Sequence, residues 1–169
     1  DIESAVERNL DTRGEKIASL DIARYGEDET VYGTRIGDKV IGFKSWSHQD
    51  TTYTIGRVVR ETRTENPILT IVDSVGIGGG VFDALKEQGV PVKDFVAGGM
   101  AIDKERFGNL RAENYYLLAK KFDEGTISIP KDQKLKSQLC DIRYTYDSKG
   151  RMFIESKEEA RSRGSKSPD

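Results

Sequence analysis

Two apolar segments that each end on an aspartate constrain the fold of this sequence more than any other feature. The first lies in residues 16–23 and contains "IASLD", ending on Asp21; the second, "PILTIVD", spans residues 67–73 and ends on Asp73. Burying a carboxylate among such side chains costs several kcal/mol unless the charge is paired or bound to a metal. Something in the chain must therefore compensate both aspartates.

The rare residue types restrict the chemistry that can provide this compensation. Among 169 residues, enough for one compact domain with a core, there is one histidine, His48, and one cysteine, Cys140. The single cysteine excludes an internal disulfide and a cysteine-rich zinc site and fits a reducing compartment. The single histidine removes most zinc chemistry, Ser-His-Asp triads and other histidine-based acid–base schemes. Any metal bound here must be held by oxygen ligands.

The hydrophobic periodicity predicts a mixed α/β sheet. An antiparallel three-strand meander precedes a helix, a parallel strand, a second helix and a further strand, and we expect helices on both faces of the sheet. The predicted strands are 16–23, 30–36, 39–46, 67–73 and a short one after Pro91; the predicted helices are 51–64, one ending at Gly89, 107–124 and 131–141. Residues 126–130 are predicted to be extended, and "RYTYDSKGRMFIE" is predicted to form a hairpin.

No internal repeat and no linker divides the sequence. We expect residues 1–15 to form a polar, partly helical lead-in and residues 16–169 to form a single domain. No apolar run reaches the roughly 18 residues of a membrane span, and the first residues carry no signal-peptide core. Membrane insertion and secretion are therefore not expected.

The two aspartates can form a metal site. If strands 16–23 and 67–73 are adjacent and parallel, Asp21 and Asp73 lie together at their carboxyl ends, where sites of open α/β sheets gather. Two such carboxylates repel each other, and Mg²⁺ or Mn²⁺ removes that repulsion. The alternative is structural: Asp21 caps the following turn and Asp73 is a helix cap or turn former. Asp28 either joins the acidic cluster or makes its own turn.

The glycines of "GIGGG", residues 76–80, follow Asp73 directly. They match a dinucleotide-binding motif only in part, because Val81 stands where a third glycine would be needed. No phosphate-binding loop of the ATPase type occurs in the sequence either. We interpret the glycines as a tight strand-to-helix turn that lets a phosphate backbone come close.

Charge is unevenly distributed along the chain. The net charge is −2, yet residues 131–166 hold ten Lys or Arg and six Asp or Glu. This asymmetry is compatible with a basic face beside an acidic pocket. Random scatter over a solvated surface explains the charges about equally well.

Several segments, in one order, resemble the nuclease domain of the large terminase subunit of tailed bacteriophages. They are "LDIARYGEDET", "IVDSVGIGGGVFDALKEQG", "FGNLRAENYYLLAKKFDEGTISIP", "YDSKGR", "IESKEEARSR" and "SPD". The resemblance covers roughly residues 16–169 and implies a ribonuclease-H-like fold that cuts double-stranded DNA with divalent metal during genome packaging. It also implies three partners, namely a packaging ATPase domain, the small terminase subunit and the portal, and a location in the cytoplasm of the infected host.

The resemblance assigns roles to four aspartates. Asp21 matches the aspartate of the first strand, Asp73 the second acidic residue, Asp169 the aspartate of "SPD", and Asp28 an accessory loop aspartate. We expect Asp21 to bridge two Mg²⁺ or Mn²⁺ ions, with Asp73 and Asp169 each completing one site. The sequence departs from the family in lacking the ATPase and in stopping at Asp169, where the family continues into a helix. We therefore expect a truncated C-terminus and weaker binding of the ion that relies on Asp169.

Contacts to DNA are expected from the basic segment, namely from Lys149 and Arg151 at the predicted hairpin turn, and from Arg111 and Asn114 on the long helix. Two other functions remain open at this point. One is a fragment of an actin- or Hsp70-type ATPase, which shares strand-end aspartates and glycine-rich turns. The other is a catalytically silent module that docks DNA or protein.

Overall fold

A computed structural model describes residues 1–23 and 29–164 of the chain. These residues form two compact units, which are treated separately. The sheet unit comprises Arg8–Val96 and Ile127–Pro130; the hairpin unit comprises Asp1–Glu7, Ala97–Thr126 and the described part of Lys131–Asp169. The expected boundary between a lead-in and a single domain at residue 16 stays a prediction.

The sheet unit is built on a mixed five-stranded sheet. Its strands, in the order β3-β2-β1-β4-β5, are β3 (Lys39–Trp46), β2 (Thr30–Ile36), β1 (Lys16–Asp21), β4 (Leu69–Asp73) and β5 (Val92–Phe95). The first three pair antiparallel, whereas β1 with β4 and β4 with β5 pair parallel. The predicted mixed sheet, an antiparallel meander extended by parallel strands, is confirmed.

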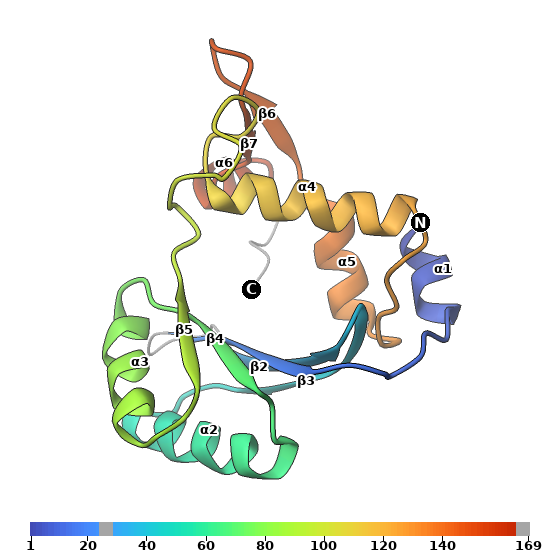
Figure 1. The fold of residues 1–169 in the computed structure, drawn as a ribbon. Helices are drawn as coiled ribbons and strands as arrows, with labels where there is room; N and C mark the ends of the chain where they lie inside the picture. Colours follow the sequence, from blue (N-terminus) through green and yellow to red (C-terminus); the bar gives the residue numbers. More distant parts are fainter. Residues whose placement is uncertain (24–28, 165–169) are drawn as a thin grey trace. The chain divides into compact units, whose positions relative to one another are not determined.

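Two helices cover one face of this sheet (Figure 1). Helix α2 (Thr51–Glu65) begins where predicted, because the Asp50 carboxylate accepts the backbone N–H of Tyr53 at 2.7 Å and caps the first turn. Helix α3 (Ile77–Glu87) follows the glycine-rich turn. The buried core between the helices and the sheet contains Ala18, Leu20, Tyr32, Trp46, Val58, Val72, Val81, Leu85 and Val90.

Alternation along the central strands decides which side chains enter this core. Ala18 and Leu20 of β1 are buried, whereas Ser19 and Asp21 are exposed, as expected for period-two alternation. The same alternation buries Val72 on β4. The residue after each buried position, Asp21 or Asp73, therefore points to the sheet face opposite α2 and α3.

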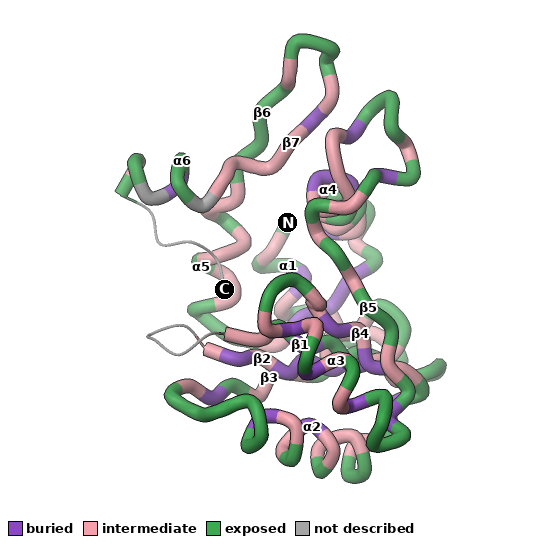
Figure 2. Tube along the Cα trace, turned by 90° about the vertical axis from the view of Figure 1, so that its left-hand side faces the viewer, coloured by how far each residue is buried: buried purple, intermediate pink, exposed green. Residues whose placement is uncertain are grey.

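The hairpin unit contains the remaining elements of the described chain. They are α1 (Ile2–Glu7), α4 (Leu110–Asp123), α5 (Gln133–Asp141), β6 (Tyr144–Tyr146), β7 (Met152–Ile154) and α6 (Lys157–Ser162). Strands β6 and β7 form the predicted hairpin. The hairpin unit has a small core of its own, which contains Ala101, Phe107, Ala112 and Met152. Figure 2 shows how the buried positions are distributed over both units.

Two predicted elements differ in extent from the structure. The long helix begins at Leu110 rather than at residue 107, because Asn109 caps it and the preceding Gly108 donates its N–H to the carbonyl of Met152 at 2.9 Å. Residues 126–130 form only a single bridge, between Ser128 and Lys39, instead of a full extended strand. In the described ranges, no helix is both long and apolar enough to cross a membrane.

Candidate functional site: an aspartate pair at the carboxyl edge of the sheet

Asp21 and Asp73 lie next to each other across the β1–β4 ladder. The parallel register pairs Leu20 with Val72, and each aspartate is the next residue on its strand. Adjacent strands are about 4.8 Å apart, and both carboxylates point to the same face of the sheet. Asp21 is exposed and Asp73 is half-buried. The strand pairing therefore places both aspartates at the carboxyl edge of the sheet, where the sequence predicts them.

Asp73 also stabilises the turn that follows it. Its Oδ1 accepts the backbone N–H of Val75 at 3.1 Å, which is the local bond typical of an aspartate in a turn. The N-cap of α3 is Gly76, which has no side-chain cap. Asp73 is thus a turn former and not the helix cap, and only one of its oxygens makes this bond.

Gly78 sets how close α3 can come to the end of β4. A Cβ atom at this position would overlap the carbonyl oxygen of Asp73 and lie 2.9 Å from its carbonyl carbon. Gly76, with φ of 66°, occupies the left-handed region that favours glycine. We expected these glycines to admit a phosphate backbone, but the space beside Gly78 is filled by the backbone of Asp73 itself.

The donor set of the site fits a hard divalent cation. Two carboxylates that are adjacent and point to one face supply oxygen ligands, which Mg²⁺ and Mn²⁺ prefer. Within residues 1–23 and 29–164, no group of three His, Cys, Asp or Glu side chains is arranged to hold a metal. Asp28 and Asp169 lie outside the described residues, so their predicted places at the site stay predictions.

The predicted DNA contacts at the hairpin turn differ in their surroundings. Asp147 accepts three hydrogen bonds within the turn. Its Oδ1 accepts the backbone N–H groups of Lys149 and Arg151, both at 2.9 Å, and its Oδ2 accepts the side-chain Nε–H of Arg151 at 2.9 Å. The backbone N–H of Arg151 is the main cause that holds the pKa of Asp147 below its ordinary value. The Arg151 guanidinium is therefore engaged within the turn, whereas the Lys149 side chain is exposed.

The two candidates on α4 lie in its first turns. Arg111 is half-buried and its guanidinium lies 5.9 Å from the ring centroid of Tyr115. Asn114 is exposed. Between them, the buried Glu113 accepts the N–H groups of Ile102 at 2.7 Å and Asp103 at 3.2 Å, and so fixes the loop before the helix. This anchoring role of Glu113 was not predicted, because it depends on a contact between segments.

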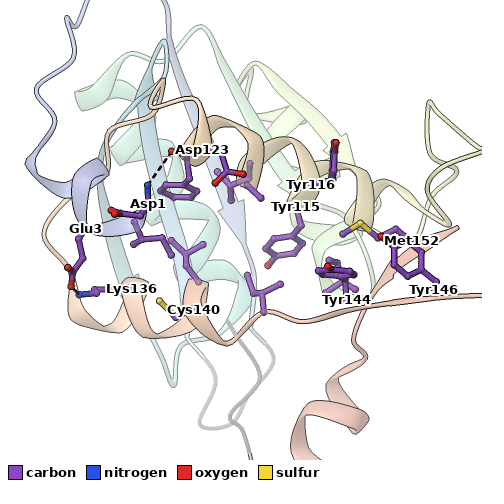
Figure 3. Close-up of a pocket in the computed structure, with 17 residues that line it drawn as sticks. Asp1, Glu3, Tyr115, Tyr116, Asp123, Lys136, Cys140, Tyr144, Tyr146 and Met152 are labelled. Atoms are coloured by element: carbon purple, nitrogen blue, oxygen red, sulfur yellow. Dashed lines mark hydrogen bonds and ion pairs between the residues drawn. The ribbon is translucent and has the colours of Figure 1, made fainter. Parts of the chain in front are cut away.

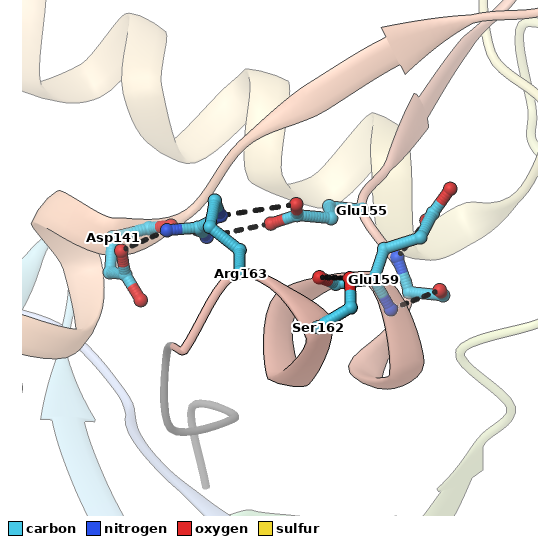
Figure 4. A network of polar contacts seen from close by, with 6 residues as sticks. Asp141, Glu155, Glu159, Ser162 and Arg163 are labelled. Atoms are coloured by element: carbon cyan, nitrogen blue, oxygen red, sulfur yellow. Dashed lines mark hydrogen bonds and ion pairs between the residues drawn. The ribbon is translucent and has the colours of Figure 1, made fainter.

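Helix α6 is held by an ion-pair network centred on Arg163 (Figure 4). The guanidinium binds Glu155 through two bonds, of 2.7 and 3.2 Å, and Asp141 Oδ1 at 2.9 Å. These two carboxylates, Glu155 foremost, raise the pKa of Arg163 further above its ordinary value. Ser156 and Glu159 close a reciprocal capping box at the start of the helix.

We expect Arg163→Met to loosen α6 selectively, because methionine keeps much of the length of the side chain but cannot bind either carboxylate. Hydrogen exchange of the α6 amides should become faster, whereas exchange in α4 should stay unchanged. Arg13→Met is a matched control, since Arg13 pairs with Asp11 at a highly exposed site. Unchanged exchange in α6 of the Arg163 variant would contradict the anchoring role.

Comparison with known proteins defines the class of fold. No family model and no curated protein matches the sequence. Comparison with solved structures, however, shows that the chain has the ribonuclease-H-like fold of phage large terminase nucleases. The nuclease domain of the large terminase subunit of the bacterial virus Sf6 superposes with a TM-score of 0.84 and 19% identity, over 99% of this chain and 90% of that one.

A second phage enzyme gives the same result at lower similarity. The large terminase nuclease of the thermophilic phage G20c matches with a TM-score of 0.68 and 12% identity, covering 92% of this chain and 86% of that one. Structures of the Sf6 domain with manganese and of the G20c nuclease with magnesium are among the matches. The fold implied by the sequence resemblance is confirmed, and identities this low establish the fold alone.

Proposed function

We propose that this chain is a divalent-metal-dependent nuclease that hydrolyses the phosphodiester bonds of double-stranded DNA. The observation that carries the proposal is the Asp21–Asp73 pair at the end of the β1–β4 ladder, in a fold shared with terminase nucleases. Those relatives were solved with manganese or magnesium, the ions that suit an all-carboxylate site. By the same analogy, the proposed setting is the cutting of concatemeric phage DNA during packaging in the host cytoplasm, beside a packaging ATPase, small terminase subunit and portal.

The aspartates are the metal ligands of the proposed mechanism. Asp21, Asp73 and Asp169 would together hold the divalent cations through their carboxylate oxygens. The bound ions would supply a more acidic attacking water and charge stabilisation at the leaving oxygen. The turn bond from Val75 orients the Asp73 carboxylate before any ligand arrives, which reduces the reorganisation required on binding. With carboxylates alone providing the site, no histidine base is required.

The proposal is tested by plasmid digestion with Mg²⁺, with Mn²⁺ and with EDTA. Nicked and linear products that require a divalent ion are expected. Absence of cleavage with either ion would contradict the proposal and favour a silent docking module. Calorimetry with ATP addresses the remaining alternative, since nucleotide binding without cleavage would favour an ATPase fragment of the actin type.

Lys149 is expected to contact the DNA backbone, because its side chain is exposed at the tip of the hairpin while its backbone N–H makes the turn bond to Asp147. Lys149→Ala should weaken binding of duplex DNA at low salt and reduce the slope of log affinity against log salt by about one. Lys86→Ala is the matched control, since Lys86 is exposed in the last turn of α3, away from the end that follows Asp73. Equal salt slopes for wild type and Lys149→Ala would place the contact elsewhere.

Arg151 is a poorer probe of the same contact. Its guanidinium holds the turn through Asp147, so its removal would alter the hairpin as well as the charge. An effect of Arg151→Ala on DNA binding would therefore combine two causes. The proposed contact is best tested with Lys149 alone.

A further inference from the structure

The hairpin unit contains a large cavity that the proposed cleavage site does not use. Its volume is about 810 Å³, and its walls are the helices α1, α4 and α5 together with the hairpin (Figure 3). The lining is mostly apolar and aromatic. Glu3 and Lys136 form an ion pair at one end of the cavity, and Asp123, from α4, also lines it.

Helix α5 is a loosely packed wall of the cavity. None of its residues is fully buried, although Leu135 and Leu139 are spaced four apart on one face. Leu139 lines the cavity, as does Ile142 just after the helix. An apolar stripe of this kind is normally covered in a folded protein. The half-buried stripe indicates that the cavity is a place where further apolar surface can bind.

The other end of the cavity is formed by tyrosines. Tyr144 and Tyr146 alternate along β6, so they share one face of the strand, and their side chains are 59% and 64% exposed. Their rings meet edge to face with centroids 5.7 Å apart. Figure 3 shows Tyr115, from α4, projecting into the same end of the cavity as Tyr144. Aromatic faces thus line this end from two different elements.

The hairpin that carries Tyr144 and Tyr146 is anchored to the rest of the hairpin unit. Its inner strand β7 is bonded to the loop before α4, through Gly108 N–H to Met152 O at 2.9 Å and Met152 N–H to Arg106 O at 2.8 Å. Phe153 packs directly over Gly108, where any Cβ would overlap its ring. A two-stranded hairpin alone is only marginally stable, so this anchoring presents the tyrosines of the outer strand in a defined position.

We propose that the tyrosine end of this cavity binds unpaired nucleobases of a DNA strand by stacking on Tyr144, Tyr146 and Tyr115. Tyrosine rings stack on any base, and such stacking is the main source of affinity in proteins that bind single strands without sequence preference. The inference deepens the proposed function, on which it rests, by adding a subsite for frayed or cut DNA ends.

The charges around the cavity favour binding of a nucleic acid at the tyrosine end. Arg143, immediately before Tyr144, and Lys149, at the turn, are exposed on the same hairpin and can neutralise phosphates. At the opposite end, Glu3 and Lys136 neutralise each other as an ion pair, so that end offers no net positive charge to a phosphate. A strand is therefore expected to follow the hairpin and insert bases, rather than to run the length of the cavity.

The test measures binding of a single-stranded oligonucleotide that contains a fluorescent adenine analogue, in EDTA so that no cleavage occurs. For wild type we expect stacking to quench the fluorescence and single strand to bind more tightly than a blunt duplex of equal length. Tyr144→Ala should lower the affinity about tenfold, and Tyr144→Phe should keep it within about twofold, because phenylalanine retains the ring. Tyr144→Leu keeps apolar contact without a ring and should resemble the alanine variant.

Tyr53→Ala is the matched control, because Tyr53 is an exposed tyrosine on α2 of the sheet unit. Equal single-strand affinity for wild type and Tyr144→Ala would overturn the inference, as would a leucine variant that binds like wild type. So would self-association of the protein that Tyr144→Ala abolishes, since a second copy would then be the occupant. If the protein cleaves DNA but its single-strand binding does not depend on the tyrosines, only this inference is refuted. If binding depends on the tyrosines but no cleavage occurs, only the proposed nuclease activity is refuted.

Discussion

Asp73→Asn is expected to abolish metal-dependent DNA cleavage, with a loss of about 100-fold or more, while the protein stays folded. Asparagine keeps the side-chain oxygen that accepts the Val75 N–H, so the turn should survive, but it removes the negative charge on which cation binding depends. Asp21→Asn should have the same effect from the neighbouring strand. Plasmid digestion with Mn²⁺ measures the loss, and thermal melting checks the fold.

The melting temperature of either variant without metal should be unchanged or higher, because the substitution relieves repulsion between adjacent carboxylates. Asp83→Asn is the matched control: Asp83 is exposed on α3, and its loss should leave cleavage at the wild-type rate. Full activity of Asp73→Asn and Asp21→Asn would show that the aspartate pair is not the catalytic centre.

Gly78→Ala should impair the site without touching a carboxylate. The added methyl group would overlap the Asp73 carbonyl, so either α3 or the end of β4 must move. Overpacking of this kind costs about 1–3 kcal/mol of stability, and a displacement of about 1 Å at a catalytic group can reduce the rate about 100-fold. Melting and plasmid digestion should therefore both report a loss.

Gly80→Ala separates this effect from that of glycine replacement in general. Gly80 lies in the same helix, and, apart from the backbone of that helix, no described part of the chain would come within 4 Å of an added Cβ. Alanine there should stabilise the protein by about 0.5–1 kcal/mol and leave the cleavage rate unchanged. If both variants cleave at the wild-type rate, the close contact of Gly78 with Asp73 has no part in holding the site.

Alternation and strand order made the aspartate pair predictable. The apolar runs before Asp21 and Asp73 imply adjacent buried strands, and the period of two then places both carboxylates at the same edge and on the same face. The sequence predicts that the glycines after Asp73 form a tight turn, but not that the Cβ position of Gly78 faces the backbone of Asp73. That distinction depends on where the Asp73 carbonyl points, which is not visible in a one-dimensional pattern.

The cavity beside the hairpin was harder to predict, because its walls come from distant parts of the chain. In the sequence, the alternating tyrosines of "RYTYD" predict only a strand of the hairpin. That alternation was the one available signal that β6 presents an aromatic face. The roles of Asp28 and Asp169 are implied only by the family resemblance, and both residues lie outside the described part of the chain.

The position of β1 at the centre of the sheet has a consequence for the newly synthesised chain. Its pairing with β2 closes a short loop, whereas its pairing with β4 must enclose β2, β3 and α2. Long-range pairings of this kind carry the larger entropy cost of closure and form slowly. A partly folded chain would thus contain both aspartates without bringing them together, so the proposed activity would arise only once the tertiary fold is complete.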